Sequence, residues 1–310
     1  MPTPEAATPR QPSRPRLRGL GVFAAYCALT AVTLAWMTPL LWMISSSFKS
    51  GEEIFRPPRA ITEARKRGPD ARAGTAELMA DVMLPDEPTV RNYGRLFTEL
   101  PFSRFFVNSI FVATAQTLLT LLFCSMGGYA FAKYVFPGRG PLFTIVLGSM
   151  MIPFHVLLVP LFSLMGTFHW FDTFRAIIIP FSASAFGIFL MRQYTLSVPD
   201  DLVDAARIDG CSEFRIYWNV VLPCVRPALG ALTIFVFMNS WNNFLWPLII
   251  LRSDAKYTLP LGLANLVGVY TQEYGMLMAG TLLSTLPIII LFLFMQREFV
   301  SGITLGAVKE

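Results

Sequence analysis

Long uncharged segments dominate the pattern of apolar and polar positions along the chain. Residues 19–48 contain no charged side chain, and this segment is longer than the about 20 residues that a helix needs to cross a bilayer. Five further uncharged or nearly uncharged segments follow, at 105–132, 141–165, 174–194, 227–251 and 275–296. The pattern therefore predicts an all-α integral membrane protein with six transmembrane helices.

Two of these segments differ from the others. A secretory signal peptide has an apolar stretch of only about 7–15 residues, so residues 19–48 are predicted to remain as a membrane anchor. The fourth segment is the weakest, because only residues 176–191 separate Arg175 from Arg192. We expect this span either to end inside the interface or to be short and covered by neighbouring helices.

Polar segments lie at both ends of the chain and after the first span. Residues 1–18 are rich in proline and arginine and are predicted to form a basic tail, and residues 297–310 form a second tail. Residues 49–103 form a loop whose charged insert, 57–88, is expected to contain one short helix near 72–83. Basic residues gather beside the spans on the side that holds both tails, and this side is the cytoplasm by the positive-inside rule. We expect a protein of the bacterial cytoplasmic (inner) membrane, with both termini cytoplasmic and the 49–103 loop extracytoplasmic.

The composition agrees with this picture. Of the 310 residues, 54% are apolar and only 15% are charged, whereas soluble domains carry about 25% charged residues. The net charge of +5 is explained by basic residues that flank the spans, so we expect no nucleic-acid partner. The 4 cysteines form no CxxC pair and the chain has 2 histidines, so we expect neither disulfides nor a metal site.

The sequence offers the chain no energy source of its own. Ion-coupled carriers need titratable groups at membrane depth, and no predicted span has an aspartate, glutamate, lysine or arginine near its middle. His155 is the ionisable side chain found there, and beside Pro153 it is expected to be a hydrogen-bonded structural residue. The GxxxxGK[ST] loop that cradles nucleotide phosphates is missing as well. We expect no enzyme activity and no cofactor in this chain, and uphill transport would need energy from a separate protein.

The cytoplasmic segment between spans four and five, residues 192–226, is too apolar for a simple connector. Apolar positions recur at helical spacing twice in it, over 202–208 and over 214–221. Asp200 and Asp201 lie in the first turn, where carboxylates favour the helix dipole. Gly210 lies where a helix ends in a left-handed turn. The pattern predicts a helix, a sharp turn and a second helix, closed by Pro223.

This helix pair has two possible roles. It can lie in the membrane interface as an amphipathic pair, with Tyr217 and Trp218 at headgroup level. It can instead dock into a groove of another protein, because Ala205 and Ala206 keep one face of the first helix narrow. The residue pattern fits both roles.

Short sequence motifs connect the chain to a known family. Asp204-Ala205-Ala206, then Asp209-Gly210, then Leu222-Pro223 resemble the cytoplasmic EAA loop of binding-protein-dependent ABC importer permeases. Asp204 stands where that family has glutamate, which shortens the reach of the carboxylate. Residues 239–248 (NSWNNFLWPL), 257–260 (YTLP) and 302–309 resemble carbohydrate-importer permeases of the maltose-transporter type, specifically the smaller permease partner.

The resemblance implies a type I ABC importer permease fold with a cytoplasmic coupling helix, and a sugar or oligosaccharide as substrate. As partners it implies a second permease subunit, two ATP-binding cassette subunits that bind ATP and Mg, and an extracytoplasmic solute-binding protein, all at a lipid membrane. The loop 198–223 would then contact the ATPase through a set of residues matched to the family motif: Asp200, Leu202, Asp204, Ala205, Ala206, Ile208, Asp209, Gly210 and Pro223.

Aromatic and amide side chains of the fifth span are candidates for the sugar path. Aromatic rings pack on the apolar faces of pyranoses, and asparagine both donates and accepts hydrogen bonds to hydroxyl groups. The same side chains can instead hold helices together, since asparagine at membrane depth commonly bonds across helices. The candidates are Asn239, Trp241, Asn242, Asn243 and Trp246.

Two other functions share part of the pattern. A permease for a non-sugar solute, such as a peptide or a phosphate ester, would have the loop but not the motifs of the fifth span and the tail. A membrane-embedded lipid-modifying enzyme would need converging acidic, histidine or lysine side chains near an interface, and the dense cluster of this kind lies in the loop 198–223. The sequence does not name the sugar.

Overall fold

The computed structural model describes residues 17–67, 74–267 and 273–304, and every element in these ranges is a helix. The predicted all-α fold class is therefore confirmed. Most of the two expected tails, residues 1–16 and 305–310, lies outside the described residues. Residues 297–304, expected to belong to the second tail, continue the last helix instead.

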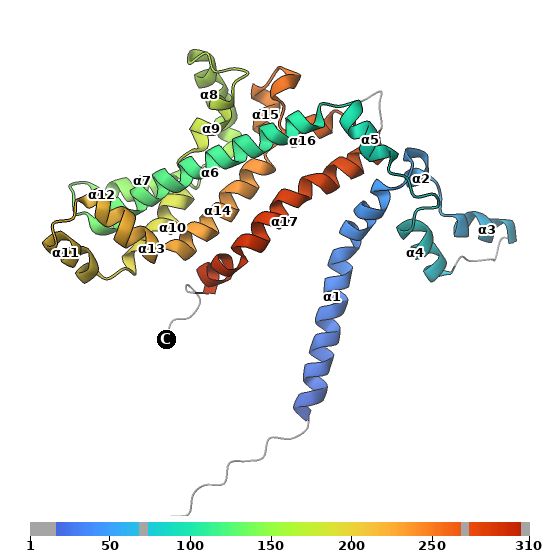
Figure 1. The fold of residues 1–310 in the computed structure, drawn as a ribbon, viewed down its shortest axis with the longest axis horizontal. Coiled ribbons are helices and arrows are strands. Elements are labelled where there is room, and N and C mark those ends of the chain that lie inside the picture. The colour runs from blue at the N-terminus through green and yellow to red at the C-terminus, as the bar shows by residue number, and fades with distance from the viewer. Residues whose placement is uncertain (1–16, 68–73, 268–272, 305–310) are drawn as a thin grey trace, which may run out of the picture.

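Three helices are long and apolar enough to cross a membrane alone: α1 (Leu17–Ser47), α6 (Phe102–Lys133) and α17 (Tyr274–Thr304). Near its C-terminal end α1 packs against α17 and α4, and its N-terminal part points away from the other helices (Figure 1). Its side chains are exposed from Gly21 to Met37, whereas those from Trp42 to Ser47 are partly or fully buried against the rest of the chain. A helix that is apolar all round is covered by lipid or by another membrane protein, so α1 belongs in a bilayer.

Bent helix pairs replace two of the predicted straight spans. The expected span 141–165 is α7 (Arg139–Ser149) followed by α8 (Phe154–Thr167), and the two helices meet at 101°. Pro153 precedes α8, and a proline has no N–H with which to continue the hydrogen bonds of α7. The expected span 174–194 consists of α9 (Phe174–Ile178) with the short turn η1 (Ile179–Phe181), and α10 (Ala185–Leu196), bent by 40°.

The fifth expected span, 227–251, is also broken. α14 (Arg226–Trp241) ends at Asn242, and the short α15 (Leu245–Ile250) begins three residues later. A further bend of 82° separates α14 from the helical segment Glu213–Cys224 that precedes it. The described residues thus contain three straight candidate spans, or up to six if each bent pair counts as one.

α6 forms the centre of the helix packing and touches α10 at glycines. A Cβ added at Gly128 of α6 would lie 2.5 Å from Cβ of Met191 and 2.7 Å from the backbone nitrogen of Arg192. At Gly187 of α10 it would lie 2.7 Å from Sγ of Cys124. These two glycines allow the helices to approach more closely than side chains would permit.

The insert after α1 contains more helix than the sequence indicates. α4 (Thr75–Met83) corresponds to the helix expected near 72–83, but α2 (Gly51–Phe55) and α3 (Arg59–Arg67) were not expected. The buried Lys49 donates from Nζ to the carbonyl oxygens of Asp81 (3.2 Å) and Val82 (2.9 Å), at the C-terminal end of α4. Asp81 Oδ2 in turn accepts a hydrogen bond of 2.7 Å from the backbone N–H of Ala60 in α3. These bonds fix both insert helices to the end of α1.

The same end of α1 is fixed to α5 (Arg91–Thr98) and to α17. The buried Asn92 donates from Nδ2 to the carbonyl oxygens of Ser47 (2.8 Å) and Lys49 (2.7 Å). Arg95 forms an ion pair of 2.9 Å with Glu273, directly before α17. The first and last long helices therefore share one anchoring point beside the insert.

Asp172, in the connection between α8 and α9, is bonded to the connection that follows α15. Its carboxylate accepts hydrogen bonds from the backbone N–H groups of Arg252 (3.0 Å) and Ser253 (3.1 Å), from the Ser253 hydroxyl and from Lys256 Nζ (3.0 Å). Partial burial alone would raise the pKa of the Asp172 carboxyl, but these hydrogen bonds outweigh it and hold that pKa well below its usual range.

Gly128→Ala should destabilise the fold by about 1–3 kcal/mol, because the new methyl group meets the backbone of α10, which cannot move away as a flexible side chain can. The matched control is Gly148→Ala in α7, where an added Cβ has nothing within 4 Å and the substitution should be neutral or stabilise by up to about 1 kcal/mol. Thermal unfolding in detergent, followed by tryptophan fluorescence, measures both. Equal midpoints for the two variants would contradict the close packing.

Asp172→Asn should lower stability by about 1–3 kcal/mol near neutral pH, because several hydrogen bonds to a charged carboxylate are weakened. A carboxyl whose folded pKa is depressed stabilises the protein above its unfolded pKa of about 4 and loses this effect as the pH falls further. The gap in unfolding midpoint between wild type and variant should therefore shrink below about pH 4. Asp201→Asn, at an exposed carboxylate, is the control and should lower the unfolding midpoint near neutral pH much less than Asp172→Asn does. A constant gap for Asp172→Asn would refute the assignment.

Candidate functional site

The predicted helix and left-handed turn of the loop 198–223 are confirmed. α11 (Asp200–Ile208) begins after Pro199, with Asp200 and Asp201 in its first turn. Gly210 has φ of +75°, a conformation in which a Cβ would be strained, and it ends the helix. Cys211 N–H then donates back to the carbonyl oxygen of Ala206 at 3.0 Å, which closes the turn.

The second half of the loop is less regular than the predicted helix. α12 (Glu213–Ile216) is capped by Ser212, whose hydroxyl accepts from the N–H of Arg215. The π-helical turn η2 (Tyr217–Val221) and the short α13 (Leu222–Cys224) follow. Pro223 lies inside α13, and the chain bends into α14 at Val225. A π-turn rotates the side chains that follow it, and here it brings Tyr217 and Val221 onto the buried side.

One side of α11 is buried and the other is exposed. Val203, with 2% of its surface exposed, packs in a cluster with Tyr129 of α6 and with Ile216, Tyr217 and Val221, and Ala206 lies half-buried beside it. Ile208 is 86% exposed. The other exposed candidate residues are Asp200, Leu202, Asp204, Ala205, Asp209, Gly210 and Pro223. A helix that keeps apolar side chains such as Leu202 and Ile208 in the open offers a contact surface to a partner.

Lys133, the last residue of α6, attaches the start of α11 to that helix. Its ammonium group lies 2.5 Å from the carbonyl oxygen of Val198 and 2.5 Å from Oδ1 of Asp200. The hydrogen bond from Lys133 lowers the pKa of the Asp200 carboxyl. The Lys133 side chain is almost fully buried whereas Asp200 is exposed, so the lysine reaches outward from the packed helix end to the loop.

Glu213, at the start of α12, makes a second attachment to the same end of α6. Its carboxylate accepts from the hydroxyl of Tyr134 at 2.6 Å and of Tyr129 at 3.3 Å, and it pairs with Nε of Arg207 at 2.8 Å. The hydrogen bond from Arg207, followed by that from Tyr134, lowers the pKa of the Glu213 carboxyl. Burial and the bond to Glu213 raise the pKa of the Tyr134 hydroxyl, so it stays protonated and donates. These attachments were not predicted, because Tyr134 and Glu213 are far apart in the sequence.

Asp204 is the residue that departs from the family motif, and its carboxylate forms an ion pair within its own helix. Its Oδ1 accepts from Nη1 of Arg207 at 3.0 Å, one helical turn later. Both side chains are largely exposed, and such pairs contribute at most about 1 kcal/mol. A partner that presents a basic group can therefore compete for the Asp204 carboxylate at small cost.

The two tryptophans proposed for the sugar path lie inside the helix packing. Trp246 is fully buried and donates from Nε1 to the carbonyl oxygen of Ala176 at 2.9 Å. Trp241 is also buried and donates from Nε1 to the carbonyl oxygen of Ser284 in α17 at 3.0 Å. Both indoles join helices together in this conformation, which is the alternative role that the sequence left open, and Trp241 also lines the pocket beside Asn242.

The three asparagines of the same stretch occupy less buried positions. Asn239 is exposed and donates to the carbonyl oxygen of Phe235, and Asn243 accepts from the N–H of Trp246 at 3.5 Å. Asn242 is exposed and lines a pocket of about 380 Å³ between α14, α16 (Leu259–Ala264) and α17. Thr281 and Ser284 of α17 add hydroxyl groups to its wall, so the pocket combines polar groups with apolar surface.

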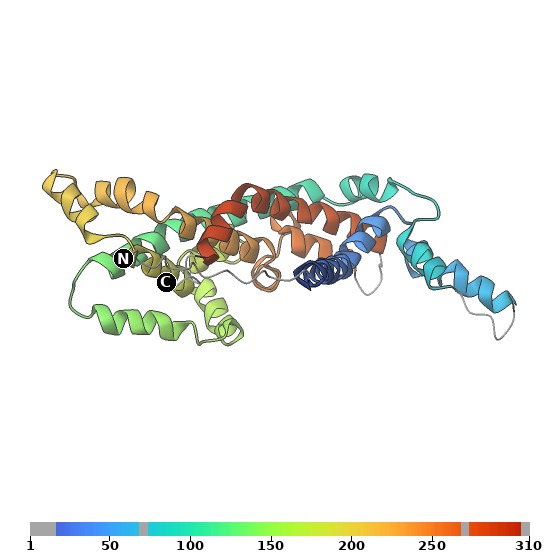
Figure 2. The ribbon, with the colours of Figure 1, turned by 90° about the horizontal axis from the view of Figure 1, so that it is seen from below.

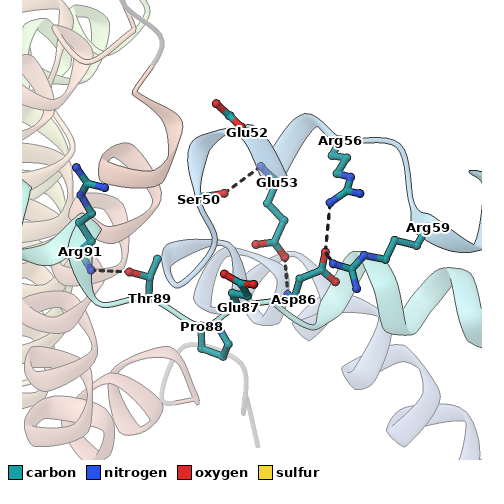
Figure 3. A pocket seen from close by; sticks show the side chains of 10 residues that line it. All are labelled: Ser50, Glu52, Glu53, Arg56, Arg59, Asp86, Glu87, Pro88, Thr89 and Arg91. Atoms are coloured by element: carbon teal, nitrogen blue, oxygen red, sulfur yellow. Dashed lines mark hydrogen bonds and ion pairs between the residues drawn. The ribbon is translucent and has the colours of Figure 1, made fainter.

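A larger pocket, of about 700 Å³, lies beside the insert and is strongly polar (Figure 3). Part of its charge is paired within the chain: Arg59 and Arg56 lie 2.5 Å and 3.8 Å from Oδ2 of Asp86, and Oε1 of Glu53 accepts from the backbone N–H of Asp86 at 2.6 Å. These contacts join α2 and the start of α3 to the segment that follows α4.

Comparisons with known proteins agree with the geometry of the loop and the helices. A family model described as "Binding-protein-dependent transport system inner membrane component" matches residues 125–304, a range that contains the whole loop 198–223. The arabinooligosaccharides transport system permease protein AraQ of Halalkalibacterium halodurans is 42% identical, covering 87% of this chain and 90% of its own. The lactose transport system permease protein LacG of Rhizobium radiobacter is 41% identical, with 94% and 98% covered.

A solved structure has the same fold. It is that of a bacterial ABC transporter involved in the import of the acidic polysaccharide alginate, with a TM-score of 0.75 at 24% identity. The likeness covers 93% of this chain and 100% of that one. The family match, the relatives and this fold together show that the chain belongs to the inner-membrane components of binding-protein-dependent ABC importers, a family of transport subunits rather than enzymes.

Proposed function

We propose that this permease moves a sugar or oligosaccharide across the cytoplasmic membrane by alternating access, and that separate ATPase subunits drive it through the loop 198–223. The observation that carries the proposal is the half-exposed α11. Val203 anchors one side of the helix, while Leu202, Ala205 and Ile208 remain uncovered on the loop surface. A short helix of this kind suits a groove in a partner.

The proposal assigns the partners as follows. A second permease subunit completes the membrane pore, and two ATP-binding cassette subunits bind ATP and Mg beneath it, with the loop and both termini on the cytoplasmic side. An extracytoplasmic solute-binding protein, which the family description names in general terms, delivers the solute. Closure of the ATPases on ATP would push α11 and thereby change which side of the membrane the pore faces.

The choice of a sugar rests on the relatives, which are named for arabinooligosaccharides and lactose. The pocket beside Asn242 is consistent with it, since hydroxyl and amide groups there share the wall with apolar side chains that suit sugar-ring faces. Uptake by the complete complex in proteoliposomes, competed with a panel of oligosaccharides, peptides and glycerol phosphate, tests the assignment. Competition by peptides or phosphate esters alone would favour the non-sugar permease.

Ala205→Leu should weaken association with the ATPase about 5- to 150-fold, because overpacking a docked face costs about 1–3 kcal/mol. Ala205 is exposed in the chain itself, so the substitution should leave its unfolding midpoint unchanged. The measurement is co-purification of the ATPase with the co-expressed complex in detergent. Ala76→Leu, at an exposed alanine of α4 in the insert, is the matched control.

Undiminished co-purification with Ala205→Leu would argue for the interfacial role of the loop. Lipid-modifying activity in an intact complex would point instead to the enzyme. Loss with Ala205→Leu but not with Ala76→Leu would place the ATPase on α11.

A further inference from the structure

α6 is an unbroken helix that runs from the loop 198–223 to the opposite end of the helix packing (Figures 1 and 2). Its 32 residues contain no proline and extend about 48 Å at 1.5 Å per residue. The neighbouring helix pairs are bent by 101°, 40° and 82°. A straight helix transmits a displacement along its axis, whereas a bent pair can absorb the displacement at the bend.

At the loop end, α6 is attached to the segments on both sides of α11. Lys133 binds the residues that begin α11, and the hydroxyl of Tyr134 binds Glu213 just after the turn. Ser125, two turns back in α6, lies 2.7 Å from the Tyr217 hydroxyl. α10, which leads into α11, is pressed against Gly128. The coupling helix is therefore held to α6 before and after its own length.

At its other end, α6 holds the segment 254–262. Asn108 donates from Nδ2 to the carbonyl oxygens of Ala255 (3.0 Å) and Tyr257 (2.9 Å). The hydroxyl of Ser109 accepts from the N–H of Leu259 at 2.7 Å. Phe105 packs directly against Gly262, where any side chain would collide with the ring. This segment also contains Lys256, which is bound to Asp172.

We propose that α6 carries the movement of the coupling helix to the segment 254–262, and that Glu213 is the positioning residue that joins the turn after α11 to α6. The inference rests on the proposed function, because it takes the ATPase as the source of the movement. Glu213 acts through Tyr134 and Arg207 and need not touch the ATPase, so its loss should separate ATPase binding from the response at the far end.

Glu213 is partly exposed, but it is held by more partners than an isolated surface ion pair has. It accepts from two tyrosines and an arginine at once, so its position is fixed from α6 and from α11 together. Charge-assisted hydrogen bonds are about twice as strong as neutral ones, and the carboxylate is the shared acceptor for all of them. Neutralising it with Gln keeps the size of the side chain and weakens every one of these bonds.

The test measures how accessible the segment 254–262, at the far end of α6, is to a labelling reagent. Ala255→Cys, at an exposed residue, is labelled with a maleimide in the complete complex with and without ATP and Mg, and labelling at position 255 is read by peptide mass spectrometry so that the native cysteines can remain. We expect ATP to change the labelling rate in the otherwise wild-type chain. Glu213→Gln should reduce this change about fivefold or more, with the ATPase still bound.

Tyr134→Phe provides a second variant that keeps the ring and removes the donor to Glu213, and it should show a loss in the same direction. Tyr26→Phe, at an exposed tyrosine of α1, is the matched control and should respond to ATP as the parent does. Together these variants keep the test decisive even if Glu213→Gln does not fold.

The outcomes separate the two proposals. If no ATPase binds the parent chain, the proposed function itself fails. If the ATPase binds but ATP leaves position 255 unaffected, or affects Glu213→Gln and Tyr134→Phe as it does the parent, α6 is not the carrier. Equal losses of ATPase binding and of the ATP response would make Glu213 a structural residue only and would also overturn the inference.

Discussion

The contact between the end of α6 and the loop 198–223 is the constraint on which the rest of the molecule depends. Val203 and Tyr217 bury one side of the loop against Tyr129. Lys133 binds the start of the loop, and Tyr134 binds Glu213 just after the turn at Gly210. Because these contacts with α6 lie on one side of the loop, the opposite side can remain exposed while the loop keeps its conformation. A flexible loop with the same residues would lose conformational freedom on every encounter with a partner.

The membrane explains why such a mechanical contact is needed. The predicted spans have no aspartate, glutamate, lysine or arginine near their middle, where ion-coupled carriers place titratable groups, and the sequence contains no GxxxxGK[ST] loop. Under the proposed function, energy reaches the chain as displacement of a packed element by another protein. Packed helices respond to displacement by changing between discrete arrangements, since their interiors are close to incompressible.

Local chemistry explains which parts of the fold could be predicted. Six apolar segments, the helix after Pro199 and the left-handed Gly210 follow from rules that act within one or two turns of chain. The bend at Pro153 was not expected, although proline gives a local signal for it, because hydropathy alone cannot distinguish a straight span from a bent one. α3 was not expected, since its stability comes from Asp81, 21 residues from Ala60 in the sequence.

In the candidate site, too, local features could be predicted from the sequence and contacts between distant residues could not. Spacing predicted the helix α11, and the resemblance to the family motif supplied its candidate contact residues. The attachment through Glu213 joins residues 79 positions apart and has no sequence pattern of its own. The tryptophans of the fifth span were candidates for the sugar path because of their type, and only the burial of Trp246 against Ala176 shows that it holds helices together. Side-chain type thus indicates what a residue can do, and packing decides which of these roles is open to it.

The two ends of α6 are held by different chemistry, and this difference bears on how the helix can work. At the loop end the bonds of Lys133 and Tyr134 are charge-assisted and partly exposed, so water can replace them when the loop moves, whereas the bond between Ser125 and Tyr217 is buried. At the other end the N–H of Leu259 donates to Ser109 in a buried contact and Phe105 packs against Gly262, so separating these groups would leave a buried donor without its partner. Under the inference drawn above, the charge-assisted bonds at the loop end adjust when the partner moves the loop, while the buried contacts of Phe105 and Ser109 keep the segment 254–262 attached to α6.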